Sequence, residues 1–222
     1  MKKTLLILSL LTLTVITSNA QYSNKTRVMV VGEGGINLST FYQAASTERT
    51  LSLGNVTRPT IGLYVKTKYP TLIGFDAGVS LSQQGTNTKD SLSAYGVFGD
   101  SAISKAILNY AYVYGDALYY FELQGDNSVH AGAGLYAGYA MNGDRVFGSD
   151  KEKLQIDNFK RVDFGFQLKI AFNIKEFISL GAQYRIAFLP ILTSFDRSGN
   201  TNNLRNSVLA LTAGIRLFEL KK

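Results

Sequence analysis

Only a few residues of this chain could carry out hydrolysis. His130 is the single histidine, and the chain contains no cysteine. With Ser128 or Ser179 and an aspartate, His130 could form a triad in which an imidazole takes the proton of a serine nucleophile. However, no sequence spacing ties these residues together, and we expect His130 near the periplasmic rim of the fold. The sequence therefore predicts a protein that is not an enzyme, with a structural role for His130.

Two glycine-rich segments and one acidic loop match ligand sites only in part. Glu33-Gly34-Gly35 and Gly132-x-Gly134-x-x-x-Gly138 precede no helical pattern, so the helix N-terminus that binds a phosphate is missing. We expect close packing in a narrow interior to explain these glycines. Gly143-Asp144 and Asp150-Lys151-Glu152 lack the ligand spacing of a calcium loop. The sequence predicts no cofactor and no metal site.

The elements that position these residues are expected to be β-strands. From Arg161 to Phe172, apolar and polar or small residues alternate at every position. A helix would scatter both sets around its circumference, whereas a strand places them on opposite faces. The same period of two recurs throughout the chain. It predicts eight strands, near residues 27–39, 58–68, 72–83, 106–121, 128–141, 160–172, 176–188 and 206–218.

The lengths of the connections indicate how these strands are arranged. Long polar gaps at about 40–57, 84–105, 142–159 and 189–205 alternate with short gaps at 69–71, 122–127 and 173–175. Barrels of the bacterial outer membrane have this pattern, with short periplasmic turns and long extracellular loops. We therefore predict an all-β fold, a closed antiparallel eight-stranded transmembrane up-and-down β-barrel. In the fourth strand we expect a bulge at Gly115-Asp116.

The residue sizes indicate which face meets lipid. The polar face is rich in glycine, serine, alanine and threonine, which suit the cramped interior of an eight-stranded barrel. Aromatic residues at the strand ends predict girdles, with Tyr119 and Phe121 at the periplasmic side and Phe41, Phe159 and Phe188 at the outer rim. Inside we expect Arg–carboxylate pairs, because an unpaired buried charge is costly. The predicted polar network of the lumen comprises Glu33, Lys66, Asp76, Asp163, Lys169, Arg185 and Arg216.

The N-terminus predicts export. Lys2 and Lys3 precede an apolar stretch from Leu5 to Ile16, and Ser18-Asn19-Ala20 supplies a cleavage site. We expect a signal peptide at residues 1–20 and a barrel domain at residues 21–222. The formal charge of +7 would fall by two to +5 on cleavage. The basic residues form no dense run, so we expect no nucleic acid as a partner, but outer-membrane lipid, lipopolysaccharide and the barrel-assembly machinery.

Several short motifs together resemble the PorT-type outer-membrane β-barrel family, whose members are often described as porin-family proteins. The resemblance covers nearly the whole chain after residue 20, implies an integral outer-membrane barrel, and implies little about activity. The motifs are Gly34-Gly35-Ile36-Asn37-Leu38-Ser39-Thr40, Ser82-Gln83-Gln84-Gly85, Leu108-Asn109-Tyr110, Gly134-Leu135-Tyr136-Ala137-Gly138-Tyr139, Asp163-Phe164-Gly165 and Gln183-Tyr184-Arg185.

The function expected from these features is non-enzymatic, in the outer membrane of a Gram-negative bacterium. Long extracellular loops would serve envelope integrity, adhesion or the binding of an envelope protein. Three alternatives remain open: a small-solute channel, an outer-membrane enzyme, and a soluble periplasmic carrier of the lipocalin type. The basic residues at the loop tips could bind lipopolysaccharide phosphates. The charged residues of the long loops are Arg49, Arg58, Lys89, Asp90, Lys105, Arg145, Lys151, Lys153, Asp196, Arg197 and Arg205.

Overall fold

The described part of the chain is built from β-strands. The computed structural model describes residues 26–43, 53–88, 105–123, 127–147, 150–153, 160–195 and 201–220. The expected signal peptide lies outside these residues. The strands are β1 (Arg27–Gln43), β2 (Leu53–Gly54), β3 (Val56–Lys68), β4 (Ile73–Thr88), β5 (Lys105–Glu122), β6 (Ser128–Phe147), β7 (Asp150–Lys153), β8 (Val162–Ile174), β9 (Ile178–Ala187), β10 (Leu192–Phe195) and β11 (Thr201–Leu220).

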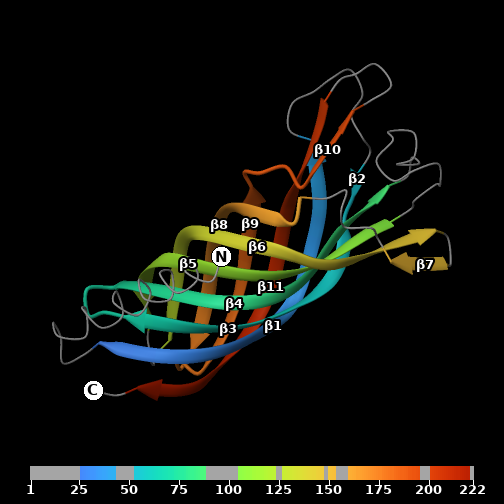
Figure 1. Cartoon of the computed structure of the whole chain (residues 1–222). Coiled ribbons are helices and arrows are strands. Elements are labelled where there is room, and N and C mark those ends of the chain that lie inside the picture. Colours follow the sequence, from blue (N-terminus) through green and yellow to red (C-terminus); the bar gives the residue numbers. More distant parts are fainter. Residues whose placement is uncertain are drawn as a thin grey trace, which may run out of the picture.

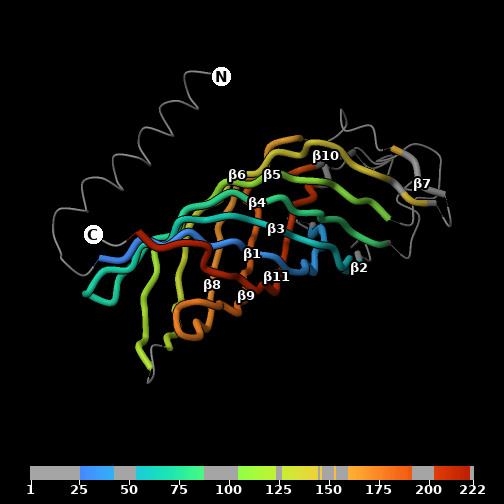
Figure 2. The backbone as a smooth tube through the Cα atoms, turned by 90° about the horizontal axis from the view of Figure 1, so that it is seen from below, coloured from blue at the N-terminus to red at the C-terminus, as the bar shows by residue number. Residues whose placement is uncertain are grey.

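Eight of these strands form a closed ring. Their order is β1-β3-β4-β5-β6-β8-β9-β11, and β11 pairs back with β1. Every neighbouring pair is antiparallel, so each strand follows its predecessor up and down around the barrel (Figures 1 and 2). Closure leaves the ring without the unpaired edge that an open sheet would expose to lipid. The predicted eight-stranded antiparallel barrel is confirmed.

The two ends of the barrel differ. At one end short turns join β3 to β4 and β8 to β9, and β1 begins beside the end of β11. In the second of these turns the N–H of Phe177 donates to the carbonyl of Ile174. At the opposite end the short strands β2, β7 and β10 pair antiparallel with the ends of β4, β6 and β11 respectively (Figure 1). We call these the turn end and the outer end.

The strands are longer at the outer end than the sequence pattern indicates. β6 and β11 each have 20 residues, and β2, β7 and β10 lie within stretches predicted as loops. Beyond the membrane both faces of a strand meet polar surroundings, so the alternation of apolar and polar residues fades there. The expected bulge at Gly115-Asp116 is wrong, because both residues pair in regular register. The register shifts instead between Asn109 and Tyr110.

The barrel carries its apolar residues outside and its polar residues inside. In β8 the side chains alternate between exposed and buried along most of its length. Ile61, Val79 and Leu168 are 64%, 54% and 47% exposed, whereas Asp163, Gln167 and Lys169 are at most 4% exposed. A soluble barrel has the opposite arrangement, so this exterior requires lipid around it. No helix among the described residues is long and apolar enough to cross a membrane.

Aromatic residues gather at both ends of this apolar belt. Tyr119 and Phe121 are exposed near the turn end, and Tyr139 and Phe188 are exposed toward the outer end. Such girdles lie at the two interfaces of membrane barrels. Phe41, expected in the outer girdle, is instead buried in the interior, because its position in β1 has the same parity as Asn37 and Ser39, which point inward. Phe159 lies outside the described residues.

Candidate functional site in the barrel interior

The interior of the barrel contains an unusual density of buried charge. Among the described residues, three basic and four acidic side chains are at most 9% exposed inside the ring: Lys66, Lys169, Arg185, Glu33, Asp76, Asp116 and Asp163. Each of these side chains points inward, while its neighbours in the sequence point toward lipid. Cationic and anionic groups therefore lie near one another in a space that excludes bulk solvent.

The centre of the interior is organised around Lys169. Its ammonium group donates a hydrogen bond of 2.7 Å to Asp76 and lies 4.2 Å from the ring centroid of Tyr64. Asp76 on β4 lies directly opposite Asp116 on β5. The amide of Gln167 donates to Asp116 at 2.7 Å. Two neighbouring carboxyl groups would repel each other, and the adjacent ammonium and amide donors offset that repulsion.

Glu33 on β1 is held by neutral donors from the two strands that follow β1 on one side of the ring, β11 and β9. The amide of Gln183 on β9 donates to one carboxylate oxygen at 2.9 Å. The hydroxyl of Thr212 on β11 donates to the other oxygen at 3.1 Å. These bonds satisfy both oxygens of a carboxylate that is 9% exposed. Hydrogen bonding of this kind keeps a buried charged group compatible with folding.

Asp163 is the acceptor of a second cluster, nearer the outer end. Tyr112, Tyr136 and Asn206 donate to its carboxylate at 3.1, 3.3 and 2.9 Å. Arg185 places its guanidinium 4.8 Å from the ring centroid of Tyr112, a cation–π contact. The expected Arg–carboxylate pairs are not formed between described residues of the interior, where the direct ion pair is that of Lys169 with Asp76.

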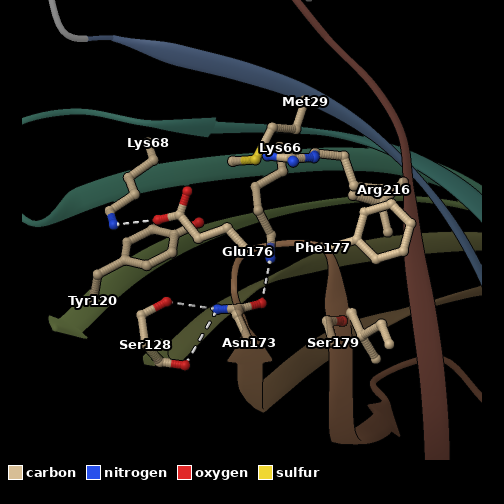
Figure 3. Close-up of a pocket in the computed structure, with 12 residues that line it drawn as sticks. Met29, Lys66, Lys68, Tyr120, Ser128, Asn173, Glu176, Phe177, Ser179 and Arg216 are labelled. Carbon is tan, nitrogen blue, oxygen red and sulfur yellow. Dashed lines mark hydrogen bonds and ion pairs between the residues drawn. The ribbon is translucent and has the colours of Figure 1, made fainter. Parts of the chain in front are cut away.

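A third cluster, near the turn end, contains His130. The ammonium group of Lys66 donates to the side-chain carbonyl of Asn173 at 3.1 Å. The amide nitrogen of Asn173 donates to Ser128 at 2.9 Å and lies 2.9 Å from Nδ1 of His130. Figure 3 shows Asn173 between Ser128 and Lys66. Tyr120 packs on the imidazole at 5.3 Å between centroids. Asn173 lies at Nδ1, where the aspartate of a triad would lie. Nε2, the nitrogen that a serine nucleophile would need, has no hydrogen-bond partner among the described residues, so this cluster has no triad geometry.

Arg216 does not join the interior network. It belongs to a group of ion pairs at the mouth of the turn end, where it donates to Glu219 at 2.8 Å. Arg27 pairs with both Glu219 and Glu176. Lys68 pairs with Glu176 at 2.7 Å (Figure 3). Glu176 reaches from the β8–β9 turn across the opening, so these charges cover the mouth. Glu33, Lys66, Asp76, Asp163, Lys169 and Arg185 lie inside, as their strand positions require.

Both ends of the interior are closed by side chains. At the outer end Phe41, Leu108, Ile191 and Leu204 are at most 2% exposed and form part of one buried apolar cluster. At the turn end the cavity behind the ion pairs holds about 10 Å³, roughly the room of one water. Side chains from all eight strands fill the space between. The interior is therefore packed rather than open.

The sequence pattern did not identify the tyrosines of the interior. Five of them, Tyr64, Tyr110, Tyr112, Tyr120 and Tyr136, are at most 3% exposed. Three of the five, and also Tyr114, lie opposite a glycine of the adjacent strand, where an added Cβ atom would come within 3 Å of the tyrosine side chain. A glycine thus provides the room that each tyrosine side chain fills. The pairs are Tyr112–Gly138, Tyr136–Gly165, Tyr64–Gly78 and Tyr114–Gly78. One signal in the sequence could have identified them, because residues two apart share a face of a strand. Tyr64 therefore shares the inward face with Lys66, and Tyr112 and Tyr114 share it with Asp116.

The described residues contain no metal site. Nowhere among them do three histidine, cysteine, aspartate or glutamate side chains converge as metal ligands would. The acidic segment considered for calcium forms the β6–β7 hairpin, in which Asp144 pairs with Lys153. Of the candidate loop residues, Arg58, Lys105 and Arg205 lie at the outer ends of β3, β5 and β11. Arg49, Lys89, Asp90, Asp196 and Arg197 lie outside the described residues.

Comparisons with known proteins yield structural neighbours alone. No family model and no curated protein matches the sequence, so the PorT-type resemblance stays a prediction. Among solved structures, OprG from Pseudomonas aeruginosa is 11% identical, with coverage of 89% and 96% of the two chains and a TM-score of 0.49. Neisserial surface protein A is 11% identical over 85% and 97%, with a TM-score of 0.45. At these values the fold assignment depends on the strand pairing described above.

Proposed function

We propose that this chain is an integral protein of a Gram-negative outer membrane whose barrel is a non-conducting anchor. The observation that supports this proposal is a closed β-barrel with an apolar exterior and a filled, charged interior. Spanning β-barrels are built in this way because every backbone polar group must be bonded within the ring. The expected signal peptide would deliver the chain across the inner membrane, and the barrel-assembly machinery would insert it.

The filled interior favours an anchor over the alternatives. A small-solute channel needs a continuous aqueous path, whereas Tyr110, Tyr112, Leu108 and Tyr136 are buried across this one. Eight strands leave an interior just wide enough for side chains. A soluble lipocalin-like carrier would line a cavity with its apolar face, but here that face points outward. A non-enzymatic role fits the His130 cluster, in which an amide and not a carboxylate lies at Nδ1, and no described serine hydroxyl is bonded to Nε2.

We propose that the outer end carries the activity of the protein. Strands project there as hairpins, and the connections are long, which is where barrels on a rigid scaffold carry binding residues. Envelope integrity, adhesion and the binding of an envelope protein are the roles that such a surface supports. Basic residues at this end attract lipopolysaccharide phosphates. The short motifs of the strands, such as Asp163-Phe164-Gly165 and Gln183-Tyr184-Arg185, support the further proposal that the chain is a PorT-type porin-family protein.

Cell fractionation with gel analysis tests the proposal. We expect the protein in the outer-membrane fraction, with a mobility on SDS gels that shifts after boiling, since closed barrels stay folded in cold SDS. In planar bilayers the refolded protein should give no discrete conductance steps. Recovery from the soluble periplasm, or regular channel openings, would contradict the anchor. Deletion of residues 91–102 should leave the mobility shift intact while reducing adhesion or detergent resistance of the cells.

A further inference from the structure

A groove interrupts the lipid-facing surface over β3, β4, β5 and β6. Its floor contains two small residues, Ala111 and Ala137, each between larger neighbours on the adjacent strands. The cross-strand rows are Leu81–Ala111–Tyr139–Val162 and Val79–Val113–Ala137–Phe164. The groove holds about 650 Å³, within the ~300–1,000 Å³ typical of ligand pockets. Its lining is apolar, so it accepts a hydrocarbon chain.

The outer end of this groove is polar. Beyond Leu81 and Ala111, the next residues that face outward are Gln83 and Asn109, which lie opposite each other. The amide of Asn109 donates a hydrogen bond to the side chain of Asn142 on β6. The apolar belt ends at this row, so these amides lie at the level of the outer lipid interface. Amides at that level donate to the esters and hydroxyls of a lipid head group.

Two strands separate beside this polar end. The ladder between β3 and β4 ends at the pair Thr60–Ser82, although both strands continue. β4 then approaches β1, where the N–H of Gly85 donates to the hydroxyl of Ser39 at 2.8 Å. Pro59, on the freed edge of β3, has no N–H that would need a partner. A second hollow of about 430 Å³ lies at this divergence and shares lining residues with the groove.

A cation lies above the polar end. Lys105 begins β5, four residues beyond Asn109, which is roughly 13 Å along a strand. Because side chains alternate between the two faces of a strand, Lys105 shares the outward face of β5 with Asn109 and Ala111. Within the part of the chain that the structure describes, Lys105 forms no ion pair with a carboxylate. It therefore attracts an anion at head-group height.

We infer that the groove, the amides and Lys105 form one binding site for a phosphorylated lipid of the outer leaflet, of the lipopolysaccharide class. An acyl chain would lie over Ala111 and Ala137, and a phosphate on the sugar head group would contact Lys105. The order of apolar, amide and cationic surface along the strands matches the order of groups along such a lipid. This inference rests on the proposed outer-membrane location and names the lipid bound there.

The test uses the refolded protein in phosphatidylcholine nanodiscs with a minor fraction of bisphosphorylated lipid A. Lipid A that remains bound after exchange into detergent is counted by mass spectrometry. The double variant Ala111→Leu, Ala137→Leu fills the groove with apolar atoms on a lipid-facing surface. Its matched control is Ala213→Leu, a lipid-facing alanine on β11. The mobility shift on boiling confirms that each variant is folded and separates failure of the barrel from failure of the site.

The expected result has two parts. The double variant should retain at least fivefold less lipid A than the wild type, while Ala213→Leu retains the same amount. Lys105→Gln should reduce retention of lipid A severalfold but leave dephosphorylated lipid A unaffected, and excess inorganic phosphate should displace little. Equal retention by the wild type and the double variant would overturn the site. Displacement of all lipid by inorganic phosphate would overturn the role of the groove.

Discussion

Lys169 carries the charge balance of the barrel interior. Its ammonium group is 2.7 Å from Asp76, and Asp76 lies opposite Asp116 on the adjacent strand. With Lys169 present, its ammonium group pairs with Asp76 and the amide of Gln167 donates to Asp116. Without it, two acidic groups would share a space closed to solvent, which is among the costliest arrangements in a protein.

Replacement of Lys169 by methionine should therefore destabilise the folded barrel by about 3–5 kcal/mol. The measurement is equilibrium unfolding in urea from lipid vesicles. The control is Lys153→Gln on β7, an exposed residue for which a change below ~0.5 kcal/mol is expected. The additional change Asp76→Asn should restore much of the loss. A Lys169→Met protein as stable as the wild type would show that the pair contributes nothing.

The sequence identified the interior charges but not their partners. Lys169 and Asp163 stand out because they alternate with phenylalanine and leucine in β8, and a membrane barrel leaves them one direction to face. Which of them pair depends on register between strands far apart in the sequence: Lys169 and Asp76 are 93 residues apart. In β5 the alternation of polar and apolar residues is hard to detect in the sequence. Its many tyrosines have an amphipathic ring that suits both the lipid interface and a polar interior.

At the scale of elements, β5 and β6 fit together through rings and glycines. Tyr112 of β5 lies opposite Gly138 of β6, and its ring occupies the position that a Cβ would take. The hydroxyl of Tyr112 lies within hydrogen-bond distance of the acceptor oxygens of Gln84 and Asp163, and its one proton is donated to either. The glycine therefore determines where the hydroxyl of Tyr112 is held.

Gly138→Ala should destabilise the barrel by about 1–3 kcal/mol, because the added methyl group forces the ring from its place. Gly115→Ala on the lipid face is the matched control, since its Cβ would meet nothing closer than 3.8 Å. It should be neutral or slightly stabilising, because alanine loses less backbone freedom than glycine on folding. The midpoint temperature of the gel mobility shift measures both. Equal effects of the two substitutions would rule out the ring–glycine contact.

The β8–β9 turn combines strained backbone with ion pairing. Lys175 and Glu176 both have φ of 49°, the left-handed region that a two-residue hairpin turn requires and that asparagine or glycine adopts more readily. Glu176 is kept there by its ion pairs with Arg27 and Lys68. At Glu176 the backbone conformation of the turn favours asparagine or glycine, whereas the ion pairs at the mouth require a carboxylate.

Lys175→Asn should stabilise the protein by about 0.5–1 kcal/mol through easier turn geometry. Glu176→Gly should destabilise it despite the same backbone advantage, because Arg27 and Lys68 lose a shared partner. Urea unfolding in vesicles with each variant checks the opposite signs. Stabilisation by Glu176→Gly would mean that the mouth charges are too exposed to matter.

Strand existence could be predicted from the sequence better than strand ends. All eight long strands overlap their predicted ranges, because lipid on one side and a polar interior on the other impose alternation between residues such as Phe164 and Gly165. Past the outer interface that contrast vanishes. Thr86 and Asn87 continue β4, and Asn203 continues β11, with nothing in their polarity to mark a strand. Pairing in these extensions comes from the neighbouring strand rather than from local composition.

At the scale of the whole molecule, the apolar belt determines how the barrel sits in a bilayer. Leu135 lies near its middle on β6 and is 52% exposed, whereas Asn142 lies beyond its outer edge. Leu135→Arg should cost about 2–4 kcal/mol and Asn142→Arg about 0–1 kcal/mol, because the cost of a lipid-facing arginine depends on depth. Unfolding in vesicles measures both. Similar costs at the two positions would contradict the membrane placement.

With the outer end facing the cell exterior, as proposed above, the length of the strands determines what can touch the protein from outside. A span needs only ~9–11 residues, yet β6 continues past Tyr139 to Phe147, roughly 27 Å along the strand and, at a tilt of ~45°, roughly 19 Å in height. The barrel wall therefore projects beyond the lipid head groups. A macromolecule too bulky to reach the bilayer surface, such as an antibody or a protein on a facing cell, meets this rigid rim first.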